Sequence, residues 1–174
     1  MNIDQLLKSK IRDIPDFPKP GIIFKDITPI LQDPQVFKKV VDAFAERYSG
    51  KKVDVFVGIE SRGFIFGAPL AYELGASFVP VRKVGKLPYK TVQESYDLEY
   101  GSATVEMHVD AVHKGQRVVV IDDLLATGGT ANATCRLLEK QGAHVLECAF
   151  VVELGFLEGR KKLPGRDIFS LVRY

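Results

Sequence analysis

Two consecutive carboxylates, Asp122 and Asp123, lie between a run of β-branched residues and a loop of small residues. The β-branched run, residues 118–121, is typical of a strand that is buried on both faces. The small loop, residues 126–130, contains glycines and threonines, so its backbone N–H groups can approach an anion closely. A helix beginning near Thr130 would add its unpaired N-terminal donors at the same place. Carboxylates beside a phosphate-binding loop indicate a ligand that carries hydroxyls or a metal ion next to its phosphate, and a sugar phosphate fits.

The elements that must position these residues alternate between helix and strand patterns. Helices are predicted over residues 3–11, 34–48, 63–74 and 130–141, and strands over 53–58, 77–82, 118–121, 145–152 and 168–172. This alternation predicts an α/β fold, with a mainly parallel twisted sheet flanked by helices on both faces. Residues 104–109 alternate with period two and predict an edge or antiparallel strand. Ligands of parallel α/β sheets bind beyond the carboxyl ends of the strands, where residues 58–63, 82–86 and 122–130 would meet.

Two stretches do not fit a plain open sheet. Residues 1–33 hold a short helix pattern followed by Pro15, Pro18 and Pro20. Residues 83–101 are long, polar and poor in apolar periodicity, and loops of that length often cover or bind a ligand. We therefore expect one domain over residues 1–174, with a distinct N-terminal segment and a long functional loop.

Composition limits the classes of function. The 174 residues have 46% hydrophobic and 26% charged side chains, as in an ordinary globular protein. A net charge of +2 is too small to indicate binding to nucleic acid or to an anionic membrane. Neither a transmembrane run nor a secretory signal pattern is present, so a cytoplasmic location is expected. Cys135 and Cys148 fit neither a disulfide framework nor a zinc site, and we expect both to be packing residues in a reducing compartment.

Residues 121–130 resemble the signature of the type I phosphoribosyltransferases, which bind phosphoribosyl pyrophosphate and move its ribose phosphate onto a nitrogen atom. Four more segments resemble the adenine-using branch of that family in the same order along the chain; they are residues 17–28, 60–64, 82–88 and 96–101. The resemblance implies the type I phosphoribosyltransferase fold, with a small N-terminal hood over residues 1–33 and a mobile catalytic loop over residues 86–108. It also implies a glycosyltransferase of purine salvage, which transfers the 5-phosphoribosyl group to adenine and gives AMP and pyrophosphate.

The resemblance further implies which residues bind phosphoribosyl pyrophosphate. Asp122 and Asp123 would hold the ribose hydroxyls. The terminal phosphate would rest on the loop formed by Ala126, Thr127, Gly128, Gly129 and Thr130. Pyrophosphate would be bound by Ser61, Arg62, Arg82, Lys83 and Lys86. Arginine offers a planar fork to phosphate oxygens and lysine a point charge, so these residue types suit the leaving group.

Adenine would be recognised from the hood. Phe24 would stack on one face of the purine and Leu154 would cover the other. The backbone at Ile23 and Lys25 would read its hydrogen-bonding edge, because one N–H and one C=O complement adenine. An oxo-purine would leave buried groups unpaired, at a cost of about 1–3 kcal/mol each. Lys25 stands where many relatives carry arginine.

Catalysis would depend on the long loop and on a metal ion. The resemblance implies that Glu99 acts as the acid or base for the proton on the five-membered ring of the purine. It also implies that Tyr100 supports closure of the loop. Mg²⁺ bridging pyrophosphate and sugar oxygens would act as Lewis acid and template, held mainly through substrate and water rather than by direct protein ligands. The expected partners are the two substrates and a second copy of the chain in a homodimer, with residues 75–86 as a contact zone.

Other interpretations stay open. A strand ending in two aspartates also occurs in NTPases, but the Gly-Lys-Ser/Thr loop of those proteins is absent. Taken singly, Arg62, Lys83, Lys86 and Glu99 could be surface charges and Phe24 a core aromatic residue. The remaining rivals are a phosphoribosyltransferase for another purine and a non-catalytic regulator that binds phosphoribosyl pyrophosphate or nucleotide. The hood segment argues against the first, and the lack of a basic excess argues against the second.

Overall fold

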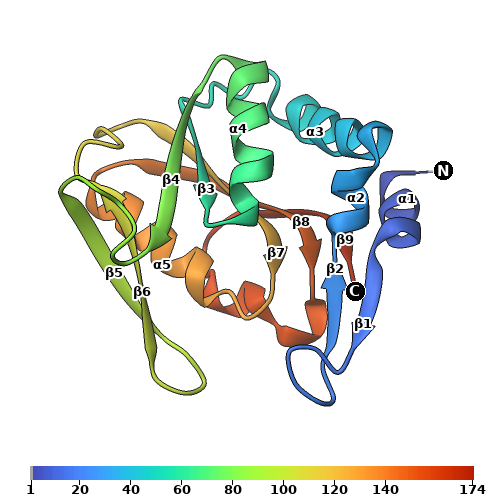
Figure 1. Ribbon diagram of the computed structural model, residues 1–174. Helices are drawn as coiled ribbons and strands as arrows, with labels where there is room; N and C mark the ends of the chain where they lie inside the picture. Colours follow the sequence, from blue (N-terminus) through green and yellow to red (C-terminus); the bar gives the residue numbers. More distant parts are fainter. Residues whose placement is uncertain (1) are drawn as a thin grey trace.

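A seven-stranded sheet forms the centre of the computed structural model, which describes residues 2–174 (Figure 1). Its order is β5-β6-β4-β3-β7-β8-β9. The strands are β3 (Val55–Ile59), β4 (Ser77–Lys83), β5 (Thr91–Asp97), β6 (Ser102–His108), β7 (Arg117–Leu125), β8 (His144–Glu153) and β9 (Ile168–Arg173). Along this order the strands from β4 to β9 pair in parallel, whereas β6 and β5 continue one edge in antiparallel fashion. The predicted mainly parallel sheet is confirmed.

Helices cover both faces of the sheet. They are α1 (Ile3–Lys10), α2 (Thr28–Gln32), α3 (Pro34–Tyr48), α4 (Arg62–Leu74) and α5 (Gly129–Lys140), with two 3-10 helices, η1 (Gly155–Leu157) and η2 (Gly159–Lys162). Successive residues of β7 point to opposite faces of the sheet. Val119 packs in the hydrophobic core between the sheet and helices α1, α3 and α4, and Val120 packs in the core between the sheet and α5. Within residues 2–174, no helix combines the length and the apolar composition needed to cross a bilayer.

Local sequence explains where two of these helices begin and end. The Asp33 carboxylate accepts hydrogen bonds from the backbone N–H groups of Gln35 and Val36, and Pro34 occupies the first turn of α3. Helix α4 ends at Gly75, whose φ of +64° lies in the left-handed region that glycine adopts without strain. The predicted start of α3 at residue 34 and the predicted end of α4 at residue 74 are therefore confirmed.

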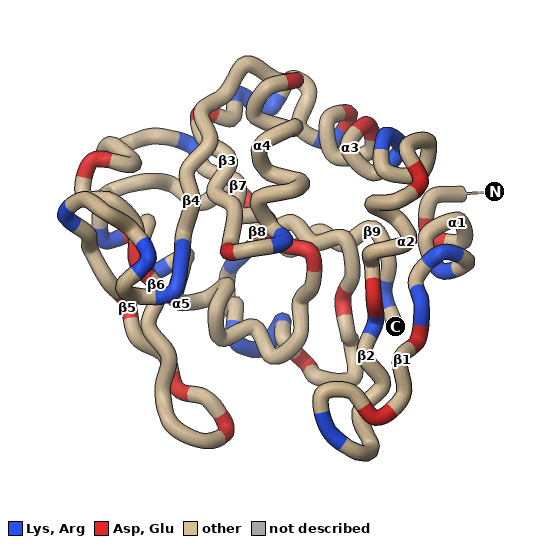
Figure 2. The backbone as a smooth tube through the Cα atoms, in the orientation of Figure 1, with Lys and Arg blue, Asp and Glu red and all other residues tan. Residues whose placement is uncertain are grey.

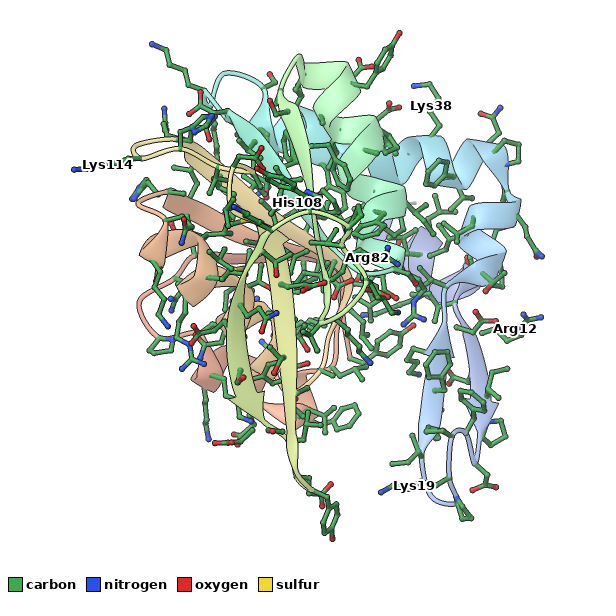
Figure 3. The ribbon with its side chains drawn as sticks, turned by 60° about the vertical axis from the view of Figure 1, so that its left-hand side comes forward. Arg12, Lys19, Lys38, Arg82, His108 and Lys114 are labelled. Atoms are coloured by element: carbon green, nitrogen blue, oxygen red, sulfur yellow. The ribbon has the colours of Figure 1, made fainter. Side chains whose placement is uncertain are left out.

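The N-terminal segment contains a hairpin that was not predicted from the sequence. Strands β1 (Arg12–Pro15) and β2 (Ile23–Asp26) form a separate two-stranded antiparallel sheet. The hairpin stands beside the main sheet, and Lys19 lies near its tip (Figure 3). Met1, the first residue of the predicted hood, lies outside the described residues. The hairpin gives the hood two faces, one of which carries Phe24.

The interpretation of residues 83–101 as a long polar loop was wrong for β5. Thr91–Asp97 pairs with β6 along its whole length, from Thr91 opposite His108 to Asp97 opposite Ser102. Glu94 occupies an inward position of this strand and is buried, paired with Arg136 and Lys140 of α5. A charged residue at an inward position hides the period-two pattern by which a half-buried strand is recognised.

Candidate active site

The carboxyl ends of β3, β4 and β7 bring three predicted segments together. Between them lies a cavity of about 300 Å³, lined by Glu60, Ser61, Arg62, Lys83, Lys86, Asp122, Asp123 and Leu124. Figure 2 shows acidic and basic segments meeting where these strands end. The cavity lies where ligands of parallel α/β sheets bind. It contains four of the five residues predicted to bind pyrophosphate and both predicted ribose-binding aspartates.

An ion pair joins α4 to β7 inside this cavity. Arg62 Nε lies 2.5 Å from Oδ2 of the buried Asp123. Gly63 permits this approach, because a Cβ atom there would lie 2.6 Å from the carbonyl oxygen of Ile121. Gly63 was not assigned a role from the sequence. The signal was a glycine in the first turn of a predicted helix, directly after a candidate anion-binding arginine.

The two neighbouring aspartates differ in environment. Burial and then the adjacent charge of Asp123 raise the pKa of Asp122 well above its usual range. Asp122 also accepts a hydrogen bond of 2.8 Å from the backbone N–H of Asp123. Asp123, in contrast, is paired with the Arg62 guanidinium, so the two carboxyl groups present their oxygens in different surroundings. Carboxylate oxygens accept hydrogen bonds, so both groups suit contact with the hydroxyls of a sugar.

Glu60 organises the basic residues and was missed in the sequence analysis. Its carboxylate accepts hydrogen bonds from Arg82 Nε at 3.2 Å, from the backbone N–H of Lys83 at 3.0 Å, and from the Lys86 ammonium. Burial acts to raise the pKa of Glu60, but these hydrogen bonds outweigh it and the pKa lies below its usual value. The signal in the sequence was an acid at the end of an apolar strand, directly before Ser61 and Arg62.

The predicted phosphate loop forms a second, smaller hollow. A cavity of about 90 Å³ is lined by residues 126–130 together with Asp122, Leu124, Leu125, Ala131 and Phe150. Gly128 has a φ of +82°, and a Cβ atom there would overlap the carbonyl oxygen of Gly159 in η2. Helix α5 begins at Gly129, so its free N–H groups lie at this hollow. Backbone donors at the start of a 12-residue helix make a site for an anion.

The three predicted adenine-binding residues of β2, namely Ile23, Phe24 and Lys25, are divided between its two faces. The Phe24 ring packs edge-on against Phe17 at 5.2 Å between centroids, and the Arg62 guanidinium lies 5.9 Å from the Phe24 centroid. Ile23, Lys25 and Leu154 instead line an apolar cavity of about 360 Å³, shared with Gly21, Ile22, Phe156, Leu157 and Tyr174. Side chains alternate along a strand, so Phe24 cannot share a face of β2 with Ile23 and Lys25. Only the backbone N–H and C=O groups along the edge of β2 can be reached by a ligand on either face of the strand.

Glu99 and Tyr100 lie at the tip of the β5–β6 hairpin. Both are exposed, Tyr100 to 84%, and the turn is closed by a hydrogen bond of 2.9 Å from Leu98 N–H to Gly101 C=O. The hairpin extends away from the sheet at the end where β3 and β7 stop (Figure 1). Neither residue lines the two cavities at the ends of β3 and β7. In this conformation, therefore, the predicted proton-handling residue is separate from the predicted sugar and phosphate site.

Comparison with known proteins assigns this arrangement to a family. Residues 26–169 match the family model described as phosphoribosyl transferase domain. The chain belongs to the phosphoribosyltransferase family. It is 60% identical to the adenine phosphoribosyltransferase of Desulfitobacterium hafniense over 94% of this chain and 95% of that protein. The adenine phosphoribosyltransferase of Acidobacterium capsulatum is 58% identical over 97% of this chain and 93% of its own length.

Solved structures of phosphoribosyltransferases share the fold. The adenine phosphoribosyltransferase of Thermoanaerobacter pseudethanolicus superimposes with a TM-score of 0.94 and 54% identity, covering 98% of this chain and 99% of that one. That of Saccharomyces cerevisiae, complexed with adenine and an iminoaltritol bisphosphate, gives 0.93 and 44% identity, covering 97% and 98%. The type I phosphoribosyltransferase fold predicted from the motifs is confirmed.

The carboxylate oxygens at the cavity are donors of the kind that a divalent cation such as Mg²⁺ prefers. Within residues 2–174, no group of three or more His, Cys, Asp or Glu side chains is placed to hold a metal ion. Asp122 and Asp123 supply carboxylate oxygens at the cavity, but Asp123 is paired with Arg62. Magnesium keeps several waters and often binds through one or two carboxylates and substrate phosphates.

Proposed function

We infer that this protein transfers the 5-phosphoribosyl group of phosphoribosyl pyrophosphate to adenine, giving AMP and pyrophosphate in purine salvage. The observation that carries this inference is the adjacency of three features: the phosphate hollow at residues 126–130, the aspartates that precede it, and the basic cavity around Arg62. Together they match the three parts of the donor, namely its terminal phosphate, its ribose hydroxyls and its pyrophosphate. The identity of 60% with a relative named adenine phosphoribosyltransferase supports adenine as the acceptor.

The donor would be held at three points. The backbone N–H groups of residues 127–130 bind the terminal phosphate, and Asp122 and Asp123 bind the ribose hydroxyls. Ser61, Arg62, Arg82, Lys83 and Lys86 receive pyrophosphate. As the bond from the anomeric carbon to pyrophosphate oxygen breaks, negative charge grows on the leaving group, and these cations stabilise it. The ion pairs of Arg82 and Lys86 with Glu60 support this assignment, because Glu60, which lines the cavity, holds both cations close to it before an anion arrives.

Adenine would approach the free backbone edge of β2. Within residues 2–174, β2 pairs with β1 alone, so its other edge can exchange hydrogen bonds with a base. Phe24 lies on the face of β2 that points toward Arg62 and offers a stacking surface next to the donor site. The backbone at Ile23 and Lys25 would select adenine over an oxo-purine, with Leu154 covering the second face.

The new bond joins a ring nitrogen of adenine to the anomeric carbon, and the proton displaced from the imidazole ring passes to Glu99. This step requires the β5–β6 hairpin to move, because Glu99 is exposed at its tip. We propose that residues 86–108 form the mobile catalytic loop and that Tyr100 supports its closed position. Closure would exclude water from a cationic sugar.

Mg²⁺ is the proposed cofactor, and the carboxylates of Asp122 and Asp123 are the protein groups near which it would be held. When bound, it supplies Lewis-acid stabilisation to the departing pyrophosphate. Chelation with EDTA should abolish product formation, and added Mg²⁺ should restore it.

A homodimer and a cytoplasmic location complete the proposal. Tyr72 on α4 is 89% exposed and Val84 is 49% exposed, so apolar surface lies beside and within the predicted contact zone at residues 75–86. Sedimentation equilibrium tests the dimer. Cys135 and Cys148 are buried free thiols whose sulfur atoms lie 3.4 Å apart, which fits a reducing compartment. Cell fractionation tests the location.

One assay tests the activity. Purified protein is incubated with Mg²⁺, phosphoribosyl pyrophosphate and adenine, hypoxanthine or xanthine in turn, and nucleotide is separated by chromatography. We expect AMP from adenine and no product from the other bases. Product from hypoxanthine or xanthine alone would reassign the acceptor. Binding of phosphoribosyl pyrophosphate with no product from any base would identify a regulator.

A further inference from the structure

A tyrosine from the hairpin strand contacts the predicted phosphate loop. The Tyr96 hydroxyl of β5 lies 2.8 Å from Oγ1 of Thr130, in the first turn of α5. The Tyr96 ring covers the turn as well, because a Cβ atom on Gly129 would lie 3.0 Å from its Cδ2 atom. Tyr96 therefore meets the phosphate loop through both its ring and its hydroxyl, although it belongs to a different part of the chain.

The direction of this hydrogen bond is fixed once a phosphate occupies the loop. Phosphate oxygens that carry no proton only accept, so a Thr130 hydroxyl that bonds to phosphate must use its single proton for that bond. Thr130 Oγ1 then has lone pairs left, and the Tyr96 hydroxyl can donate to it. The Thr134 hydroxyl also donates a hydrogen bond of 2.9 Å to Thr130, but its acceptor is the backbone carbonyl oxygen, so this bond does not occupy the Thr130 hydroxyl. The result is a chain of two hydrogen bonds from Tyr96 through Thr130 to phosphate, and such chains strengthen cooperatively.

Tyr96 also stands at the base of the turn that carries Glu99. The strand pairing of β5 with β6 ends with Asp97 opposite Ser102, one residue after Tyr96. The carbonyl of Ser95 accepts a hydrogen bond of 2.9 Å from Arg136 of α5, so the last residues of β5 are attached to that helix at two adjacent points. The tip beyond them projects into solvent, since residues 98–100 are all exposed.

We propose that Tyr96 is a positioning residue: its hydroxyl orients the Thr130 proton toward the terminal phosphate of the donor and couples the Glu99 hairpin to the occupied phosphate loop. This inference rests on the proposed function, because it takes residues 126–130 as the phosphate site. It adds a residue outside the loop to that site. It also gives a physical link through which donor binding restrains the hairpin before adenine reacts.

The test uses Tyr96→Phe, which removes the hydroxyl and keeps the ring over Gly129. The matched control is Ser95→Ala, which removes the hydroxyl contact of 2.8 Å between Ser95 and Thr104 in the same hairpin without touching α5. Binding of ribose 5-phosphate to the full-length protein is measured by titration calorimetry. A net hydrogen bond between neutral groups corresponds to roughly 2- to 10-fold in affinity, so Tyr96→Phe should weaken binding by that factor. Ser95→Ala should bind as the wild type does.

Two further measurements separate positioning from a merely structural role. In a Thr130→Val background, Tyr96→Phe should cause no additional loss of affinity, because the acceptor of its hydrogen bond is gone. Hydrogen exchange of residues 97–102 should be slowed by ribose 5-phosphate in the wild type and in Ser95→Ala, but not in Tyr96→Phe. Thermal unfolding of each variant shows whether the fold is intact.

The outcomes distinguish this inference from the proposed function. If the wild type binds ribose 5-phosphate and Tyr96→Phe binds it equally well, the role of Tyr96 is overturned while the phosphate site stands. That role is also overturned if Tyr96→Phe causes the same loss of affinity in the Thr130→Val background as in the wild type. If the wild type itself does not bind ribose 5-phosphate, both the phosphate site and the role of Tyr96 are overturned.

Discussion

Arg62 Nε donates to Oδ2 of Asp123 over 2.5 Å, so the first residue of α4 is held by an acid near the end of β7. The Asp123 side chain is 8% exposed, whereas that of Arg62 is 46% exposed. The contact uses the inner nitrogen of the guanidinium and leaves the outer nitrogens for an incoming anion. The buried carboxylate of Asp123 thus fixes the orientation of the partly exposed Arg62 guanidinium.

Arg62→Lys should therefore impair use of the donor substrate. Lysine keeps the charge but lacks the planar fork that can bond to Asp123 and to phosphate together. A hydrogen bond to a charged group contributes about 1.5–3 kcal/mol, so kcat/KM for phosphoribosyl pyrophosphate should fall by roughly 10- to 100-fold. Arg166→Lys, which changes a pair with Glu139 on another part of the surface, is the matched control. Equal kcat/KM for Arg62→Lys and Arg166→Lys would contradict the assignment.

Glu99→Gln should lower turnover more than substrate binding. General acid–base assistance contributes about 10²–10⁴-fold, so kcat should fall by that factor while KM for adenine changes little. Asp97→Asn is the control, since it removes a charge from the same exposed hairpin. Steady-state kinetics over a range of pH checks both variants. A kcat for Glu99→Gln equal to that of Asp97→Asn would remove Glu99 from the proton transfer.

Gly128→Ala should damage the phosphate loop beyond the strain of its backbone angle. Gly128 and Gly50 have nearly the same φ, +82° and +81°, but a Cβ atom meets nothing within 4 Å at Gly50 and overlaps Gly159 at Gly128. Gly50→Ala should lower the free energy of unfolding by about 1–2 kcal/mol, the cost of a left-handed alanine. Gly128→Ala should lower it further and raise KM for phosphoribosyl pyrophosphate. Urea unfolding of the two variants measures how much the contact of the Gly128→Ala side chain with Gly159 adds to the loss of stability. Equal losses of unfolding free energy in both variants would show that the loop can move away from η2.

The free energy of unfolding should depend on pH in the acid range because of Asp26 in the hood. Hydrogen bonds from the Thr28 hydroxyl and from Arg12 lower the pKa of Asp26 to about 2. Because the folded pKa lies below the unfolded value of about 4, the charged carboxylate stabilises the fold above about pH 4. This contribution is lost as the pH falls from about 4 toward about 2. The difference in unfolding free energy between wild type and Asp26→Asn should shrink over that range, whereas a pH-independent difference would refute the interpretation.

The central motif could be read from the sequence because local and tertiary signals agree there. Residues 118–121 are apolar, the acids come where the strand meets the cavity, and glycines follow where backbone must approach a ligand. The β1–β2 hairpin was not predicted, since each strand has four residues and prolines lie in and between them. Strands that short give no usable periodicity.

The site was predicted less completely than the fold because its chemistry depends on contacts between distant segments. Glu60 meets Lys86 across 26 positions of the chain, and Tyr96 meets Thr130 across 34. Neither pairing leaves a local pattern. The side of β2 on which each base-binding residue lies follows from the register of the hairpin, with Lys25 opposite Asp13, and that register depends on the geometry of the turn between β1 and β2.

Because Glu60 already engages Arg82 and Lys86, any pyrophosphate entering the cavity competes with an internal anion. Part of the attraction between product and protein is offset by the ion pairs that the product displaces. When pyrophosphate departs, the carboxylate takes back the same two cations. A site built in this way can stabilise a highly charged leaving group during the reaction without retaining it afterwards.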